Sequence, residues 1–417
     1  MDQMLSDAKK IIHDAIQASL PNEAVKKAIY GKNFDFQGKV IVIAIGKAAW
    51  NMAKAAAENI PHKIDAGIVL TKYDHSQGVI PGFTILEAGH PLPDENTISG
   101  TKKIIEAVSD LTEKDTVFFL VSGGGSALFE KPAGSLGLTD FLDITDQLLK
   151  CGADIVEINT IRKHLSAVKG GRFAELCAPA KVFCIALSDI LGDRPDSIAS
   201  GPACADASTS AEAFAVVEKY NLQLTEEMKA QLAKETPKFL SNVTMEITGS
   251  VTQLCQDAAA TAKELGYTPT ILTNMLDCEA KESGKFLASI AKTIRKDGLP
   301  LKPPCAIICG GETIVRITGK GKGGRNQELA LSAAESIAGM EGVVVAAAGS
   351  DGTDGPTDAA GGIVDGNTKS ILESKGISIS AILADNDSNR ALGAADALLM
   401  TGPTGTNVND IYLLLCR

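Results

Sequence analysis

Short apolar runs alternate with helix-like stretches along the whole chain, and this alternation restricts the possible fold more than any other feature. The first apolar run, 40–45, leads through Gly46-Lys47 into an alanine-rich stretch at 48–58. Three more runs of strand length follow, at 66–70, 116–121 and 182–187. Such an order predicts an α/β protein in which helices cover the faces of parallel sheets.

A polar stretch at 220–241, which carries Pro237, separates a second block with the same alternation. This block predicts strands at 268–272, 305–309, 313–317, 343–348 and 410–415, and a helix at 327–338. An amphipathic helix at about 6–29 can pack on either block. With 417 residues the chain is long enough for two to three domains.

Composition excludes several functional classes. The net charge of −11 and the aromatic content of 4% leave no basic, stacking surface for nucleic acid. The longest apolar runs are far shorter than the roughly 18 residues that span a bilayer, so we expect no membrane segment.

The first residues lack a basic and then apolar leader, and the nine cysteines are odd in number without a CxxC pair. We therefore expect a cytoplasmic protein with reduced thiols. No sequence feature predicts its oligomeric state.

The strongest local motif is the glycine-rich loop that follows the apolar run 116–121. Ser122, Gly123, Gly124, Gly125 and Ser126 stand between this strand and the start of a helix. Glycines let the backbone approach an anion closely, and free N–H groups and serine hydroxyls donate hydrogen bonds to it. A tight turn without a ligand is the alternative, although a plain turn seldom needs three consecutive glycines. The motif predicts a phosphate-binding or substrate-binding loop.

A lysine stands at the carboxyl end of the first predicted strand. Gly46-Lys47 occupies the position where ligands bind in open α/β sheets, so Lys47 is a candidate phosphate clamp. The chain contains no G-x-x-x-x-G-K-[ST] spacing, so Lys47 is not a Walker A lysine. A solvated lysine at a helix start remains the alternative.

A second glycine-rich segment, 319–328, follows the predicted strand 313–317 and contains Gly323 and Gly324. Its glycines formally match the dinucleotide pattern G-x-G-x-x-G, but the acidic residue expected about 20 positions later is poorly placed. Its two lysines and Arg325 suit a triphosphate better. The guanidinium of Arg325 can stabilise a transferring phosphoryl group. A flexible basic loop is the alternative.

Acidic side chains follow two further predicted strands. Asp351, Asp354 and Asp358 come after the run 343–348, and we predict that Asp351 and Asp354 help to hold Mg²⁺. An ordinary Asp/Gly turn is the alternative. Asp189 follows the run 182–187 and is a candidate general base or metal ligand. The five histidines lack zinc-site spacing, and no complete G-x-S-x-G elbow occurs.

Taken together, these motifs resemble one enzyme family along nearly the whole chain. The matching segments also include 87–94, 161–166, 169–172, 199–202, 310–313 with Gly311 and Glu312, 323–328, 350–355 and 401–407. On these segments the chain resembles glycerate kinases of the glycerate 2-kinase type.

The resemblance implies two three-layer α/β/α domains with the active site in the cleft between them. A Rossmann-like glycerate-kinase domain with a mainly parallel sheet would cover 1–238, although a helix within 1–35 can pack on the second domain. A MOFRL domain with a mixed sheet would cover 239–417.

The implied reaction is the ATP-dependent and Mg²⁺-dependent phosphorylation of D-glycerate to 2-phosphoglycerate. The resemblance assigns catalytic roles to Lys47, Arg325 and Asp189. It also places Gly311 and Glu312 among the phosphate-binding and substrate-binding residues.

Two other functions are compatible with parts of the sequence. Relatives of this family have been labelled hydroxypyruvate reductases, so an NAD(P)H-dependent hydroxypyruvate reductase is the enzymatic alternative. The sequence, however, lacks the well-placed dinucleotide fingerprint that such a reductase needs. A non-catalytic sensor of small anions would explain the loop Ser122–Ser126, but it would not explain why Lys47, Asp189 and Arg325 accompany that loop.

Overall fold

The computed structural model describes residues 2–417, which form two compact units that we name after their sheets. The parallel-sheet unit comprises Pro21–Ser188 and Asp193–Thr248. The mixed-sheet unit comprises the segment up to Leu20, the short segment Asp189–Gly192 and the segment Gly249–Arg417.

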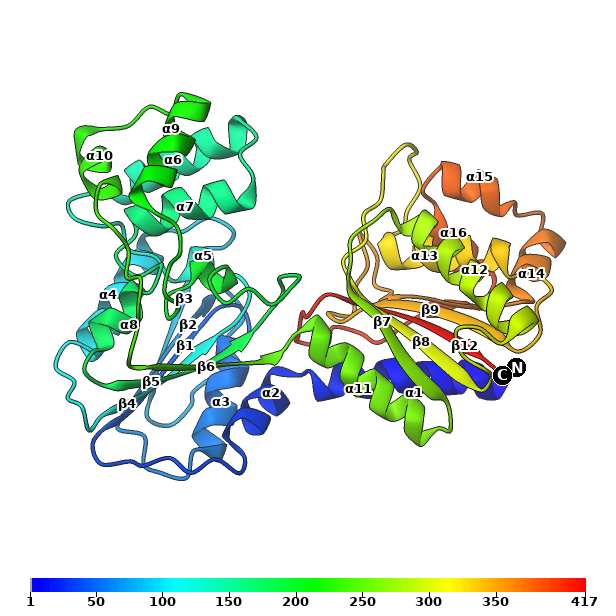
Figure 1. Ribbon diagram of the computed structural model, residues 1–417, viewed down its shortest axis with the longest axis horizontal. Helices are drawn as coiled ribbons and strands as arrows, with labels where there is room; N and C mark the ends of the chain where they lie inside the picture. Colours follow the sequence, from blue (N-terminus) through cyan, green and yellow to red (C-terminus); the bar gives the residue numbers. More distant parts are fainter. Residues whose placement is uncertain (1) are drawn as a thin grey trace. The chain divides into compact units, whose positions relative to one another are not determined.

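The parallel-sheet unit alternates strands and helices in its first half and is mainly helical in its second half (Figure 1). Its elements are α2 (Pro21–Ile29), β1 (Val40–Ile45), α3 (Ala49–Asn59), β2 (Ala66–Lys72), β3 (Phe83–Ala88), α4 (Glu95–Ala107), β4 (Thr116–Val121), α5 (Gly125–Leu128), α6 (Leu138–Lys150), α7 (Ile155–Leu165), α8 (Arg172–Cys177), β5 (Lys181–Leu187), the 3₁₀ turn η1 (Ile198–Ser200), α9 (Ser210–Tyr220), α10 (Glu226–Leu232) and β6 (Val243–Gly249).

The strand order of the first sheet is β3-β2-β1-β4-β5-β6, the doubly wound order of Rossmann-type folds. The pairs β3–β2, β2–β1, β1–β4 and β4–β5 are parallel. The order reverses between β1 and β4, where Ile45 pairs with Val121 at the carboxyl ends of both strands. Ligands of open α/β sheets bind at such a switch point. The fold therefore brings Gly46-Lys47 and the loop Ser122–Ser126 to one edge of one sheet.

Alternate residues of these strands face the two sides of the sheet. Val42 and Phe118 pack on α2 and α3 in one apolar cluster. On the other side, the ring of Phe119 lies 5.9 Å from that of Phe129 and 4.5 Å from that of Phe173, centroid to centroid. Helices α6, α7, α9 and α10 share a separate apolar cluster (Figure 1).

The mixed-sheet unit combines six strands with helices on both faces (Figure 1). Its elements are α1 (Asp2–Ala18), α11 (Val251–Glu264), β7 (Thr268–Leu276), α12 (Ala280–Asp297), β8 (Cys305–Gly311), α13 (Arg325–Ser336), β9 (Val343–Gly349), β10 (Gly361–Asp365), α14 (Thr368–Ser374), α15 (Ile379–Ala384), α16 (Ser388–Ala394), β11 (Leu398–Leu399) and β12 (Asp410–Cys416).

The strand order of the second sheet is β11-β10-β9-β12-β8-β7. Only the β7–β8 pair is parallel, and the other four pairs are antiparallel. Residues of one parity, such as Ile308 and Leu413, pack on α1 and α11, whereas Ile307 and Leu414 pack on α12 and α13. This alternation produces the three-layer α/β/α architecture.

Two predicted elements are wrong in detail. The segment 313–317 is not a strand: β8 already has β7 and β12 as neighbours, and Ile314 makes only an isolated bridge with Glu279. The helix predicted at 6–29 is divided into α1 and α2, and Pro21 is the first residue of α2. The two helices belong to different units.

Among residues 2–417, no helix combines the length and the apolar character that crossing a bilayer requires.

Candidate functional site

The switch point of the parallel sheet places Lys47 beside the glycine-rich loop. The backbone N–H of Lys47 donates to the carbonyl oxygen of Gly123 at 2.9 Å. The hydroxyl of Ser122 accepts from the N–H of Ala48 at 3.1 Å and donates to the Ile45 carbonyl at 3.2 Å. The buried Ser122 side chain therefore connects the ends of two neighbouring strands. Its hydroxyl already makes one hydrogen bond as donor and one as acceptor within the chain.

Gly46 is required at this point by its conformation and by its neighbour. Its φ is +107°, and a Cβ there would lie 2.3 Å from Oγ of Ser122. Gly124 has φ +83° and approaches the ring of His90, where a Cβ would lie 3.0 Å from Nε2 and 3.2 Å from Cγ of Lys47. Both glycines thus allow the loop to lie against the base of the Lys47 side chain.

Positive charge gathers around this loop in an acidic protein. Burial, and then the charge of Lys47, lower the pKa of His90, and Lys72 and His75 add to this effect. The ring nitrogen Nδ1 of His75 lies 3.1 Å from the carbonyl oxygen of Lys47. The two lysines among these residues, Lys47 and Lys72, can attract an anionic ligand whatever the net charge of the chain.

A buried lysine holds the loop from behind. Nζ of Lys169 donates to the carbonyl oxygens of Gly125 and Ala199, both at 3.0 Å. Burial lowers the pKa of Lys169, and the buried carboxylate of Glu130 opposes this shift. Sequence analysis gave Lys169 no individual role, because its two acceptors are backbone atoms that no residue pattern reveals.

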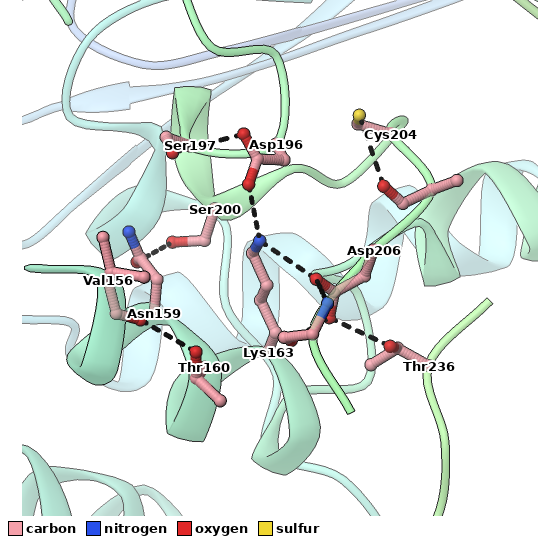
Figure 2. A network of polar contacts seen from close by, with 12 residues as sticks. Val156, Asn159, Thr160, Lys163, Asp196, Ser197, Ser200, Cys204, Asp206 and Thr236 are labelled. Atoms are coloured by element: carbon pink, nitrogen blue, oxygen red, sulfur yellow. Dashed lines mark hydrogen bonds and ion pairs between the residues drawn. The ribbon is translucent and has the colours of Figure 1, made fainter. Parts of the chain in front are cut away.

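The loop is also tied to a network of buried polar side chains. Oγ of Ser126 lies 3.0 Å from Oγ of Ser200, which donates to Oδ1 of Asn159 at 3.1 Å. Figure 2 shows this bond next to Lys163, whose ammonium lies between Asp196 and Asp206 at 3.4 and 3.2 Å. Because the Ser200 proton is engaged by Asn159, Ser126 donates the bond between the two hydroxyls, and its oxygen keeps lone pairs for a ligand.

In the mixed-sheet unit, Arg325 is held by two acidic residues. Its Nε and Nη2 atoms donate to the two oxygens of Asp410 at 2.5 and 3.0 Å, and Nη1 donates to Oε1 of Glu312 at 2.7 Å. Arg325 begins α13 and its side chain is 33% exposed, whereas that of Asp410 is 1% exposed. This bidentate pair fixes the plane of the guanidinium.

Asn409 links this pair to Asp189. Its Nδ2 donates to Oε2 of Glu312 at 3.0 Å and to the carbonyl oxygen of Asp189 at 3.1 Å. Burial raises the pKa of Asp410 to about 6, against the opposing effect of Arg325. The structure thus brings together three predicted residues, Glu312, Arg325 and Asp189. It adds Asp410 and Asn409, which sequence analysis did not assign to the site.

The segment 319–324 folds onto the chain itself. The N–H groups of Gly319, Lys320 and Lys322 donate to side-chain oxygens of Asn386, Asp385 and Asp387 at 2.9 to 3.1 Å. A Cβ on Gly321 would lie 2.3 Å from that of Asp387. The match to a dinucleotide pattern therefore reflects close packing of Gly319 and Gly321 on the 385–388 turn and of Gly324 on Asp354.

Asp354 is a helix cap. Its Oδ1 accepts from the backbone N–H and the side chain of Asn326, and its Oδ2 accepts from both groups of Gln327. These four bonds occupy the four lone-pair sites of a carboxylate, so Asp354 has none left for a metal ion. Within residues 2–417, the side-chain carboxylate of Asp351 accepts hydrogen bonds only from Thr353, through its Oδ1 atom.

Gly311 also has a packing role. A Cβ at this position would lie 2.0 Å from the carbonyl oxygen of Leu276 on β7. No group of three or more His, Cys, Asp or Glu side chains within residues 2–417 is arranged to hold a metal ion. One carboxylate such as Asp351, completed by substrate phosphates and water, is a donor set that suits Mg²⁺.

Arg325, Asp351, Gly323 and Gly324 line a pocket of about 600 Å³ in the mixed-sheet unit. The fold and these two groups of residues define an α/β protein of two units, each with a cationic side chain, Lys47 after β1 and Arg325 at the start of α13, where a small anionic ligand can bind.

Comparison with known proteins specifies the family. Residues 7–233 match the family model described as "Domain of unknown function (DUF4147)", and residues 305–410 match the MOFRL family. The chain belongs to this family of proteins that join a DUF4147 domain to a MOFRL domain.

Its relatives include named enzymes. The D-glycerate 2-kinase of Thermotoga maritima is 54% identical over 406 residues, which cover 97% of each chain. The crystal structure of glycerate kinase from the same organism matches with a TM-score of 0.96 at 53% identity, covering 100% of both chains. A protein of Agrobacterium vitis, provisionally named a hydroxypyruvate reductase, is 41% identical and covers 91% of this chain and 87% of its own.

Proposed function

We propose that this protein is an ATP-dependent D-glycerate 2-kinase. The observation that carries the proposal is the identity of 54% to the Thermotoga maritima D-glycerate 2-kinase along 97% of both chains. The site chemistry supports it, because a phosphoryl transfer needs fixed cations around the transferring group more than it needs covalent catalysis.

Arg325 is the residue best prepared for this task. Asp410 and Glu312 engage three of its five N–H groups and fix its plane, which leaves two N–H groups for a phosphate oxygen. We assign Lys47 and the loop Ser122–Ser126 to the binding of anionic substrate groups.

The reaction transfers one phosphoryl group from ATP to the 2-hydroxyl of D-glycerate. The hydroxyl oxygen forms a bond to the γ-phosphorus, the bond from that phosphorus to the bridging oxygen breaks, and ADP leaves. We assign the hydroxyl proton to the carboxylate of Asp189. Asp351 would hold Mg²⁺, which neutralises charge on the phosphate oxygens when it is bound.

The reductase alternative has the name of the Agrobacterium vitis relative in its favour. The glycines at 319–324 do not support it, because Gly319, Gly321 and Gly323 pack on the 385–388 turn and Gly324 packs on Asp354. The first turn of the doubly wound sheet reads Gly46-Lys47-Ala48-Ala49 and has no dinucleotide fingerprint either.

Two assays on one preparation separate these functions. The kinase proposal predicts glycerate-dependent release of ADP, followed through a coupled enzyme, and no oxidation of NADH or NADPH with hydroxypyruvate. Oxidation of the reduced nucleotide without any glycerate-dependent ADP would replace the kinase by the reductase.

A further inference from the structure

We propose that the pocket of about 600 Å³ in the mixed-sheet unit is the nucleoside site of the phosphoryl donor. The adenine ring would lie against the segment Ile314–Ile317, and the phosphates would extend toward Arg325 and Asp351, which line the same pocket. This inference rests on the proposed kinase function and specifies which unit binds the nucleotide. The volume of this pocket falls within the range of about 300 to 1,000 Å³ that is typical of small-molecule and cofactor sites.

The segment beside the pocket is an extended strip with an unused hydrogen-bonding edge. At one end Ile314 is fixed by two backbone hydrogen bonds: its N–H donates to the carbonyl oxygen of Cys278, and its carbonyl oxygen accepts from the N–H of Ala280. At the other end the N–H of Thr318 donates to Oδ1 of Asn386 at 2.8 Å. Between these anchors, the N–H and carbonyl groups of Val315 and Ile317 make no hydrogen bond within residues 2–417.

A free backbone edge of this kind can recognise a purine. Adenine presents a donor, its 6-amino group, next to ring nitrogens that accept, and a peptide edge offers the complementary carbonyl and N–H. Because the strip is anchored on both sides, it does not have to be ordered when the ligand binds.

The same strip exposes apolar side chains toward the pocket. Ile314 is 60% exposed and Ile317 is 81% exposed, and both residues line the pocket together with Val315 and Pro356. When a flat, weakly polar ring covers exposed isoleucines, apolar surface is removed from water and the free energy of the complex is lowered. Glycerate has no apolar surface of comparable size, so these side chains favour the nucleoside as the occupant.

The other end of the pocket suits the phosphates. Gly323, Gly324 and Arg325 line it, and their three backbone N–H groups have no hydrogen-bond acceptor in the described part of the chain. The guanidinium of Arg325, whose plane is fixed by Asp410 and Glu312, adds its two remaining N–H donors. Asp354 also borders the pocket, but its oxygens are engaged by Asn326 and Gln327.

The test removes apolar surface without disturbing the core. Ile314→Ser and Ile317→Ser replace exposed side chains, and Ile371→Ser is the matched control, since Ile371 lies on α14 of the same unit, is 38% exposed and does not line the pocket. Binding of MgADP is measured by isothermal titration calorimetry, together with inorganic tripolyphosphate as a ligand that lacks the nucleoside. The KM values for ATP and D-glycerate are measured on the same proteins.

We expect each pocket variant to weaken MgADP binding and to raise the KM for ATP about tenfold, which corresponds to roughly one isoleucine contact. Affinity for tripolyphosphate and the KM for glycerate should change less than twofold, and Ile371→Ser should match the wild type. Wild-type affinity for MgADP in both pocket variants would overturn the inference, even in an active kinase.

The inference and the proposed function can fail separately. Isoleucine-dependent binding of MgADP in a protein that phosphorylates nothing would support the nucleoside site and refute the kinase. If the wild type binds no MgADP, or if NADH binds in an isoleucine-dependent manner and MgADP does not, the inference is refuted.

Discussion

Replacing Asp410 by asparagine tests whether the carboxylate that holds Arg325 matters for turnover. The substitution keeps the size of the side chain but turns one of two acceptors into a donor that faces the guanidinium. Asp410 is 1% exposed and makes two bonds to Arg325, while Glu312 supplies a third. Tyr412 also donates to Asp410, at 3.2 Å. The perturbation is therefore confined to the residues that surround Arg325.

The expected magnitude follows from these contacts. A hydrogen bond to a charged group contributes about 1.5 to 3 kcal/mol, and the new amide donor is buried without an acceptor, which costs about 1 to 3 kcal/mol. Glu312 remains as a partner, so we expect a loss of about 2 to 4 kcal/mol in the free energy of unfolding. If half of this energy also orients Arg325 in the transition state, turnover falls about 5- to 30-fold.

The assay compares kcat and urea unfolding with those of a matched control, Asp365→Asn. Asp365 is also a buried carboxylate, and it accepts from backbone N–H groups of Asn367 and Thr368. It pairs with Val344 at the start of β9, whereas Asp410 pairs with Gly349 at the end of that strand. The control should lose stability and keep its turnover. If Asp410→Asn kept kcat within threefold of the wild type while losing stability, Asp410 would support only the fold.

Four further outcomes are expected. Gly46→Ala should lose about 3 kcal/mol or more and most activity because its Cβ collides with a buried hydroxyl, whereas Gly78→Ala, with the same φ near +108° and open space, should lose only about 1 kcal/mol in urea unfolding. Lys169→Met should cost about 2 to 5 kcal/mol in the same experiment because two buried carbonyls lose their donor, and an unchanged midpoint would refute the clamp. Lys47→Ala should lower kcat/KM about 100-fold without changing the melting temperature, and near-wild-type kinetics would remove it from the mechanism. The pKa of Asp410 lies near 6 in the folded protein and near 3.8 in the unfolded chain, so kcat should fall as the pH decreases through 6. Between these values the folded state binds the extra proton, so the wild type should gain stability relative to Asp410→Asn as the pH decreases from 6 to 4.

Most of the fold follows from the sequence because its buried strands are unbroken apolar runs. The six residues of β1 and of β4 are all buried, and runs of this kind have few alternatives in an α/β protein. Strand β3 was missed because its residues are only half-buried, and β10 because it begins with two glycines. The segment 313–317 looks like a strand by composition, but both edges of β8 are occupied by other strands.

The site was predicted less completely, because some of its residues are brought together only by strand pairing between distant parts of the sequence. Lys47 can be found because it follows a strand and topology gathers strand ends at one edge of a sheet. Arg325 can be found because it follows a glycine-rich segment and begins a helix. Asp410 is separated from Arg325 by 85 positions, and only the antiparallel pairing of β12 with β8 and β9 brings the two together. Its one local signal is an acidic residue directly before an apolar run.

Phosphorus NMR on the purified protein with ATP, Mg²⁺ and D-glycerate is the most direct test of the central claim. One spectrum follows the loss of the γ-phosphate and identifies the carbon that carries the new ester. The account predicts a signal of 2-phosphoglycerate that grows in step with ADP. A signal of 3-phosphoglycerate would contradict the assignment of the 2-hydroxyl, and intact ATP beside folded protein would contradict the kinase itself.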